Sequence, residues 1–319
     1  MVGGNRPPTC TRLSDRANRY ANAGDSLYFP AMSTYRGRLA PTPTGEMHLG
    51  HARTFHAAWR RSQDADGAIV LRIENLDPLR CRPEYTQQML DDFAWMGISW
   101  SEGPYYQSQR TDAYVDAWRR LRDTGVIYPS AVSRKELRDA ALAPHEDEEG
   151  AEPIFPVEWR APVEAARAHE QPFGIAWRFC VPDGEVIRFT DVRRGEQAFV
   201  AGADFGDFVL WRRDGVPAYE LAVVADDIAM GITEVVRGED LLLSTARQLL
   251  IYRALGATPP AWCHEPLVRD REGRRLAKRY RALSLRTLRE RGLTWPQVRD
   301  ATPEQVASLA AAHGDSTPP

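Results

Sequence analysis

From residue 37 onward, short apolar runs alternate with longer segments in which apolar residues recur every three or four positions. The short runs have the length of β-strands, and the longer segments have the periodicity of helices that bury one face. The pattern predicts a strand at 38–41, a helix at 49–65, a strand at 68–73 and helices at 83–95 and 109–124. Parallel strands need such helical crossovers, so this order predicts an α/β fold with an open parallel sheet and a ligand at the carboxyl ends of its strands.

The alternation breaks between residues 129 and 205. An acidic loop at 143–150 precedes short runs of strand-forming composition at 174–181, 186–192 and 197–200. We interpret 129–205 as an inserted α+β subdomain with antiparallel strands. The α/β pattern then resumes with a strand at 207–211, a helix at 219–226, a strand at 233–237 and a helix at 245–255.

This organisation gives the expected domains. Residues 1–36 lack periodicity and are expected to form a disordered leader, with Met1 and Met32 both open as the initiator. Residues 37–128 and 206–256 are expected to form two halves of one nucleotide-binding domain around the insertion. Residues 257–319 are expected to hold a basic loop and a short C-terminal tail with one helix at 302–312.

Composition narrows the function classes. The chain has 319 residues, 27% of them charged, no apolar run of membrane-spanning length and no signal sequence, so we expect a cytoplasmic globular protein. Its cysteines lie far apart in the sequence, which does not favour a zinc site or a disulfide framework. The net charge of −3 still allows a nucleic-acid partner, because a local basic surface can bind a polyanion.

Candidate chemistry begins after the first predicted strand. A turn containing Pro41 and Gly45 leads to His48, Gly50 and His51 at the start of a predicted helix. A helix N-terminus presents unpaired N–H groups and a partial positive charge, and imidazoles can donate hydrogen bonds to phosphate oxygens. We therefore predict an ATP site here. Zinc is the rival ligand, but the sequence offers no third and fourth ligand at a suitable spacing.

A second basic segment lies at residues 274–279. It contains Lys278, and Lys135 is the other lysine of a chain whose remaining basic residues are arginines. A lysine on a loop could stabilise the negative charge that develops when the α-phosphate of ATP is attacked. The alternative is an ordinary surface lysine.

Residues near the predicted strand ends could bind an amino acid. Glu74 would face its ammonium group, Arg237 would bind a carboxylate in bidentate fashion, and Tyr219 would form one wall. Arg38 could read a second carboxylate, which would indicate an acidic side chain. Each of these charges could equally belong to an exposed ion pair.

Several blocks, in this order, resemble the catalytic domain of glutamyl-tRNA synthetases. They lie at 38–45, 48–54, 71–77, 213–227, 236–240 and 275–279. The resemblance covers residues 37 to about 290. It implies the Rossmann-like fold of class I aminoacyl-tRNA synthetases and the use of ATP with Mg²⁺ to activate glutamate.

The resemblance also assigns residues. The positions that match glutamate-binding residues are Arg38, Leu39, Ala40, Pro41, Thr42, Glu74, Tyr219 and Arg237. The positions that match ATP-binding residues are Pro41, Gly45, His48, Gly50, His51 and Lys278. Of these, His48, His51 and Lys278 would be catalytic.

About forty residues follow Lys278, so no anticodon-binding domain is expected. In this respect the chain resembles the shorter paralogues that attach glutamate to queuosine in the anticodon loop of tRNA(Asp). They imply L-glutamate and queuosine-bearing tRNA(Asp) as partners, a monomer, and no membrane. Many members hold zinc through three cysteines and a tyrosine, but the matching stretches 128–134 and 154–160 contain no cysteine, so we predict no zinc.

Other functions remain open from the sequence. The chain could charge the 3′ end of a tRNA with an anticodon domain lost or supplied by another chain. It could be a non-catalytic RNA-binding paralogue, although His48, His51 and Lys278 are all present. A small-molecule nucleotidyltransferase would not require Glu74 and Arg237 together.

Overall fold

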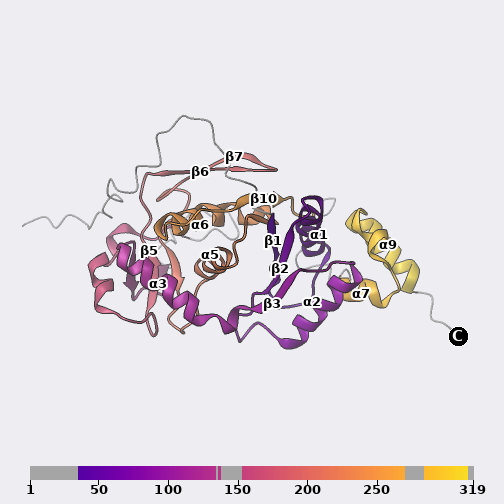
Figure 1. Ribbon diagram of the computed structural model, residues 1–319, viewed down its shortest axis with the longest axis horizontal. Coiled ribbons are helices and arrows are strands. Elements are labelled where there is room, and N and C mark those ends of the chain that lie inside the picture. Colours follow the sequence, from indigo (N-terminus) through magenta and orange to yellow (C-terminus); the bar gives the residue numbers. More distant parts are fainter. Residues whose placement is uncertain (1–34, 134–135, 138–152, 270–283, 315–319) are drawn as a thin grey trace, which may run out of the picture.

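The central sheet is parallel. The computed structural model describes residues 35–133, 136–137, 153–269 and 284–314 (Figure 1). Its parallel strands are β1 (Arg36–Leu39), β2 (Ala68–Ile73), β3 (Glu102–Tyr106), β9 (Glu234–Gly238) and β10 (Ala261–Glu265). The backbone N–H of Thr233 donates to Arg36 O at 2.9 Å, so β9 begins beside β1. The order β3-β2-β1-β9-β10 reverses between β1 and β9, as in a Rossmann-like sheet, and confirms the predicted fold class.

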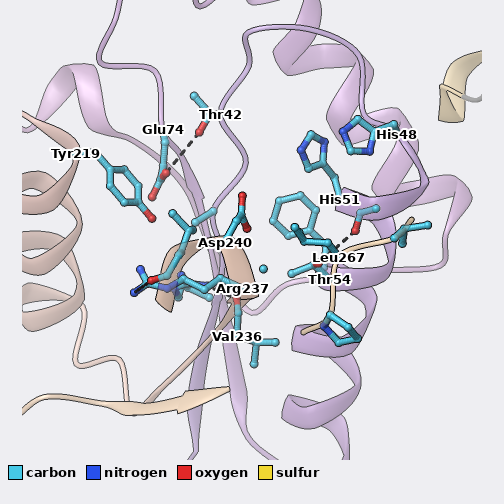
Figure 2. Close-up of a pocket in the computed structure, with 18 residues that line it drawn as sticks. Thr42, His48, His51, Thr54, Glu74, Tyr219, Val236, Arg237, Asp240 and Leu267 are labelled. Carbon is cyan, nitrogen blue, oxygen red and sulfur yellow. Dashed lines mark hydrogen bonds between the residues drawn. The ribbon is translucent and has the colours of Figure 1, made fainter. Parts of the chain in front are cut away.

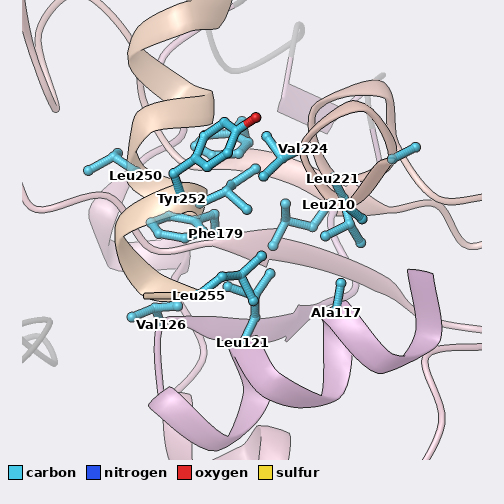
Figure 3. Close-up of a cluster of buried hydrophobic side chains, with 14 of the residues drawn as sticks. Ala117, Leu121, Val126, Phe179, Leu210, Leu221, Val224, Leu250, Tyr252 and Leu255 are labelled. Atoms are coloured by element: carbon cyan, nitrogen blue, oxygen red, sulfur yellow. The ribbon is translucent and has the colours of Figure 1, made fainter. Parts of the chain in front are cut away.

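Helices cover both faces of this sheet. They are α1 (Leu49–Asp64), α2 (Pro83–Trp95), α3 (Thr111–Thr124), α5 (Tyr219–Ala229) and α6 (Leu242–Ala254). Alternate residues of β2 point to opposite sides, so Leu71 packs in one apolar cluster with α1 and α2, whereas Val70 packs in another with α3, α5 and α6. Figure 3 shows part of the second cluster. Within the described residues, no helix has both the length and the apolarity needed to cross a bilayer.

Most predicted elements are confirmed, with small shifts at their ends. The helix predicted at 109–124 is α3, and it buries one face, because Tyr114, Trp118 and Leu121 are all inaccessible to solvent. Two strands of the sheet were not predicted. β3 contains Gly103 and Pro104 and is largely exposed, so it lacks an apolar run. β10 has five residues of mixed polarity, including His264 and Glu265, so it also lacks a clear apolar pattern.

The boundary of the expected leader is different in the structure. Residues 1–34 lie outside the described part of the chain, but Tyr35 and Arg36 belong to the folded domain. The Tyr35 hydroxyl donates to Glu234 at 2.7 Å, and the Arg36 guanidinium pairs with Glu102 at 2.5 Å. The folded part therefore begins before residue 37, because these two side chains connect the start of β1 to β9 and to β3.

The strands of the insertion do not form one separate sheet. β4 (Ile127–Ser130), β5 (Ala176–Phe179) and β8 (Phe208–Trp211) form an antiparallel sheet, so β8 does not join the parallel sheet as expected. β6 (Val186–Asp191) pairs antiparallel with β7 (Gly195–Val200) but parallel with β10, and it extends the central sheet. The acidic loop at 143–150 lies outside the described residues. The division into domains stays a prediction.

A buried ion pair holds the antiparallel sheet together. Both side chains of the Arg160–Asp207 pair are almost inaccessible to solvent, and Arg160 Nε lies 2.8 Å from Asp207 Oδ2. The same carboxylate accepts from the Tyr128 hydroxyl at 2.5 Å and from the Val181 N–H at 2.9 Å. Arg160 also pairs with Asp183. The Asp207 carboxylate, just before β8, thus connects Tyr128 of β4, Val181 just after β5, and Arg160.

The C-terminal region contains more structure than the expected single helix at 302–312. Short helices α7 (Leu285–Glu290) and α8 (Trp295–Arg299) precede α9 (Pro303–Gly314). Leu285, Trp295 and Val298 are buried in the same apolar cluster as α1 and α2, so this region is part of the core rather than a loose tail (Figure 1). The rest of the expected tail, from residue 315 on, lies outside the described residues.

Replacing Asp207 by Asn should strongly destabilise the fold. The substitution removes the fully buried counter-charge of Arg160 and leaves it paired only with the part-exposed Asp183. Breaking a buried ion pair typically costs about 3–5 kcal/mol, and the remaining pair places the expected loss near the lower end of this range. We expect a loss of this size in the free energy of unfolding measured in urea. As a control, Arg60→Met breaks the exposed Arg60–Asp64 pair and should cost less than about 0.5 kcal/mol. Equal losses in the two variants would contradict this role for Asp207.

Candidate active site

A cavity of about 340 Å³ opens at the carboxyl end of the central sheet, where the strand order reverses between β1 and β9 (Figure 2). Ligands of open α/β sheets usually bind at this point. The predicted site residues that line the cavity are Arg38, Ala40, Thr42, His48, Gly50, His51, Glu74, Tyr219 and Arg237. The structure thus brings together residues from five separate segments of the sequence.

Three predicted residues in the described ranges do not line the cavity, and a fourth lies outside these ranges. Leu39 points into the core, and Pro41 contributes its carbonyl oxygen, which accepts from the Glu74 N–H at 2.9 Å. Gly45 lies in the turn before α1, where an added Cβ would meet no atom within 4 Å. Lys278 and the rest of 270–283 lie outside the described residues.

One end of the cavity is formed by the start of α1. His48 is the N-cap residue in an extended conformation, and its side chain makes no capping hydrogen bond. The His48 and His51 rings stack with their centroids 3.7 Å apart. Gly50 lies against this stack, since an added Cβ would be 3.3 Å from the His48 ring. The helix dipole and two imidazoles therefore face the cavity together, an arrangement suited to phosphate oxygens.

The opposite end carries the Glu74 carboxylate. Figure 2 shows Glu74, Tyr219 and Thr42 gathered there, and Tyr219 remains 38% exposed. The fully buried Arg72 donates to Glu74 Oε1 at 3.1 Å and to Asp227 Oδ1 at 2.6 Å. Burial raises the pKa of the Glu74 carboxyl, and the guanidinium groups of Arg72 and Arg38 oppose this rise. Arg72 fixes Glu74 Oε1, and Oε2 accepts a long hydrogen bond of 3.5 Å from Thr42 Oγ1. A carboxylate oxygen can accept more than one hydrogen bond, so Oε2 can also accept from a ligand ammonium.

The guanidinium of Arg38 makes fewer hydrogen bonds to described residues than the guanidinium of Arg237 does. The Arg38 side chain is 5% exposed and donates from Nη1 to Val236 O at 2.8 Å. Its buried Nε makes no hydrogen bond within the described part of the chain. Burial lowers the pKa of this guanidinium, and a carboxylate that enters the cavity would offset the cost of desolvation.

Arg237 is held differently from what the sequence led us to expect. Its Nη1 donates to Gln248 Oε1 at 3.0 Å, and its Nη2 donates to Thr245 Oγ1 at 2.7 Å and to Leu241 O at 3.3 Å. Its Nε lies 3.1 Å from His264 Nε2. A guanidinium has five N–H groups, so contacts among the described residues engage four of them and leave one. A bidentate bond from Arg237 would therefore require one of these contacts to break.

Sequence reasoning missed several residues of the site. Asp240 and Leu267 line the cavity, and Asp240 lies between its two ends in Figure 2. Arg72 belongs to one of the blocks that carry the family resemblance, but the sequence does not show that its side chain is fully buried. From the sequence alone it cannot be distinguished from an exposed arginine. His264 contacts Arg237 because the two residues are paired on the neighbouring strands β10 and β9. The sequence does not show this pairing.

No metal site is evident within the described ranges. There, no group of three or more His, Cys, Asp or Glu side chains is placed to hold an ion. In the stretches compared with zinc-binding members, the Tyr128 hydroxyl binds Asp207 and Arg160 pairs with the same carboxylate. The absence of zinc stays a prediction.

The chain is similar to known proteins over most of its length. A family model described as the catalytic domain of class I tRNA synthetases for Glu (E) and Gln (Q) matches residues 34–302. A glutamyl-Q tRNA(Asp) synthetase from Nitratidesulfovibrio vulgaris is 46% identical over 268 residues, which cover 81% of this chain and 82% of the relative. A protein of the same name from Rhodopirellula baltica is 41% identical over 277 residues, which cover 82% of each chain.

Longer proteins are also similar. A glutamate–tRNA ligase from Thermosynechococcus vestitus is 41% identical over 291 residues, which cover 86% of this chain but 59% of the ligase. The crystal structure of glutamate–tRNA synthetase from Elizabethkingia anophelis superposes with a TM-score of 0.65 at 28% identity, covering 77% of this chain and 53% of the synthetase. This chain therefore spans about half the length of that solved structure.

The buried His264 predicts how stability depends on pH. Burial and the nearby Arg237 lower the pKa of His264 from 6.5 to about 4, against the opposing effect of Asp191. Between these values the unfolded chain binds a proton that the folded chain does not bind. The free energy of unfolding should therefore fall as the pH falls through this window, by up to about 1.4 kcal/mol per pH unit from this residue.

Urea unfolding at several pH values checks this expectation. The His264→Gln variant lacks the titrating ring, so its stability should fall less steeply than that of the wild type between pH 6.5 and about 4. Parallel pH profiles of the two proteins would show that His264 does not titrate as described.

Proposed function

Since the chain belongs to the class I tRNA synthetases of the glutamate and glutamine type, we propose that it is a ligase that activates L-glutamate with ATP and transfers it to queuosine in tRNA(Asp). Relatives that carry this function in their name match the chain over about four fifths of both lengths. The observation that carries the proposal is one cavity with charged groups for an amino acid at one end and groups for phosphate at the other.

The glutamate end fits an amino acid with two carboxylates. Glu74 would accept from the ammonium group, and Tyr219 would close the wall beside it. Arg38 would bind one carboxylate with two N–H groups, because among the described residues its Nη2 and part of its Nη1 have no hydrogen-bond partner. Arg237 would give its remaining N–H to the other carboxylate. The backbone from Leu39 to Thr42 would line the floor of this end, as the family resemblance implies.

The phosphate end would bind ATP. His48, His51 and the first N–H groups of α1 would donate to phosphate oxygens, with Gly50 allowing close approach. The family resemblance adds Pro41, Gly45 and Lys278 to this set. Mg²⁺ would take most of its ligands from the phosphates and water, which agrees with the lack of a three-residue metal cluster in the described ranges.

The chemistry needs two displacements. An oxygen of the glutamate α-carboxylate attacks the α-phosphorus of ATP, and the bond to pyrophosphate breaks to leave glutamyl-adenylate. A hydroxyl of the cyclopentenediol on queuosine then attacks the glutamyl carbonyl, and AMP leaves. Neither step needs a strong protein base, because positioning and charge stabilisation lower both barriers. An exposed anticodon-loop nucleotide is the kind of RNA feature that proteins read most readily.

We further propose a monomer that acts in the cytoplasm, where ATP and tRNA are available. The alternative of charging a tRNA 3′ end is supported by the similarity to glutamate–tRNA ligases, of which this chain covers little more than half. The two functions differ in the nucleotide that receives glutamate, and this difference can be measured.

Two assays test the proposal together. ATP–pyrophosphate exchange without tRNA should proceed with glutamate and far more slowly with aspartate or glutamine, because these lack the second carboxylate or its reach. Radiolabelled glutamate should then transfer to tRNA(Asp) that contains queuosine and not to queuosine-free tRNA(Asp). Transfer to both tRNAs would favour 3′-end charging, and a lack of exchange with all three amino acids would exclude the catalytic proposal.

Arg38→Lys should weaken glutamate binding selectively. An ammonium group cannot make a bidentate bond, so we expect the KM for glutamate to rise about ten- to hundredfold while the KM for ATP stays nearly constant. Arg36→Lys is the matched control, because Arg36 lies on the same strand but pairs with Glu102 away from the cavity. An equal rise in both variants would contradict the role given to Arg38.

A further inference from the structure

Three buried residues form a chain of hydrogen bonds behind the cavity. His264 Nδ1 lies 2.6 Å from Asp191 Oδ2, and His264 Nε2 lies 3.1 Å from Arg237 Nε. The Thr245 hydroxyl lies 3.2 Å from the same Nε2. The three side chains are between 0% and 4% exposed. They come from the neighbouring strands β6, β10 and β9, in which Asp191 pairs with Trp262 and Arg237 pairs with His264.

The partners determine where the proton of His264 lies. Arg237 Nε can only donate, so His264 Nε2 must accept. The ring is therefore neutral with its proton on Nδ1, which donates to the Asp191 carboxylate. The backbone N–H of His264 also donates to Asp191 Oδ2 at 3.0 Å, so the carboxylate fixes both the ring and its strand. The lowered pKa of His264 agrees with this neutral state.

We propose that His264 is a positioning residue for glutamate recognition: with its tautomer set by Asp191, it holds the Arg237 guanidinium in the orientation that presents the remaining N–H to the substrate carboxylate. His264 does not line the cavity and would act through Arg237. This inference rests on the proposed function, because it assumes that Arg237 binds glutamate.

His264 supplies the acceptor for Arg237 Nε that the other contacts of Arg237 do not provide. Thr245 and Gln248 bind the two terminal nitrogens, and both residues lie on α6. His264 accepts from Arg237 Nε and lies on the neighbouring strand β10. The Arg237 guanidinium also lies 4.9 Å from the ring centroid of Trp262. Without an acceptor on this side, the buried Nε–H would be unsatisfied, and the guanidinium would gain by rotating towards another acceptor.

The contact also connects the insertion to the site. Asp191 ends β6, and its Oδ1 accepts from the backbone N–H groups of Arg193 and Arg194 at 3.0 and 2.8 Å in the turn to β7. A displacement of this hairpin would therefore move Asp191, His264 and Arg237 together. The inserted strands would in this way help to set the amino-acid pocket although they do not line it.

Two substitutions of His264 separate positioning from packing. In His264→Gln, the amide oxygen can occupy the place of Nε2 and accept from Arg237. In His264→Asn, the shorter amide can replace Nδ1 at Asp191 but cannot reach Arg237. We expect the Asn variant to raise the KM for glutamate about ten- to hundredfold in ATP–pyrophosphate exchange, and the Gln variant to raise it less than about threefold. The KM for ATP should change less than about twofold in both.

A double-mutant cycle tests whether the effect passes through Arg237. In an Arg237→Lys background there is no Nε–H, so the Gln and Asn variants should have the same KM for glutamate. Thermal unfolding of each protein checks that the comparison is made between folded enzymes. If the Asn variant does not fold, His264→Met takes its place, because Met has the length of Gln without an acceptor.

The outcomes distinguish the two proposals. A wild-type enzyme with no glutamate-dependent exchange would overturn the proposed function and this inference with it. An active wild type whose Gln variant loses as much glutamate affinity as the Asn or Met variant would overturn the positioning role alone. A KM for ATP that rose together with the KM for glutamate would also overturn the positioning role.

Discussion

The burial of guanidinium groups at the carboxyl end of the central sheet is the constraint on which the site depends. Arg72 is fully buried and lies between the carboxylates of Glu74 and Asp227. A buried charge is tolerated when it is paired and hydrogen-bonded, and the pairing also fixes the partner in place. Arg72 therefore orients Glu74, while Val236, Thr245, Gln248 and His264 orient the two arginines that face the cavity.

The sequence was sufficient for the order of the main elements and for the blocks that meet at the cavity. Strong apolar periodicity marked α1, β2 and α2, and each of these is buried on the expected face. β3, β10, α7 and α8 were missed because they are short and have mixed polarity, and tertiary pairing stabilises them rather than local preference. The strand at 207–211 was predicted, but its pairing with β5 was missed because an apolar run indicates burial and does not identify the partner strand.

Within the site, the sequence identified residues by type but not by their hydrogen-bond partners. Arg38 and Arg237 looked equivalent in the sequence. Among the described residues, one side-chain hydrogen bond of Arg38 is made, to Val236 O, whereas Arg237 uses four of its five N–H groups. Asp240 lies in the turn that follows β9. His264 contacts Arg237 through the β9–β10 pairing, which links segments more than twenty residues apart. Such contacts depend on strand register, and a single sequence does not specify it.

The central claim is that one cavity binds glutamate and the phosphates of ATP side by side. A crystal structure with a non-hydrolysable glutamyl-adenylate analogue would test it most directly. The account predicts that Arg38 makes two hydrogen bonds to a glutamate carboxylate, that Glu74 accepts from the ammonium, and that the phosphate mimic lies at the N-terminus of α1 beside His48 and His51. An analogue bound away from these groups, or with its ammonium facing Arg38, would contradict the account.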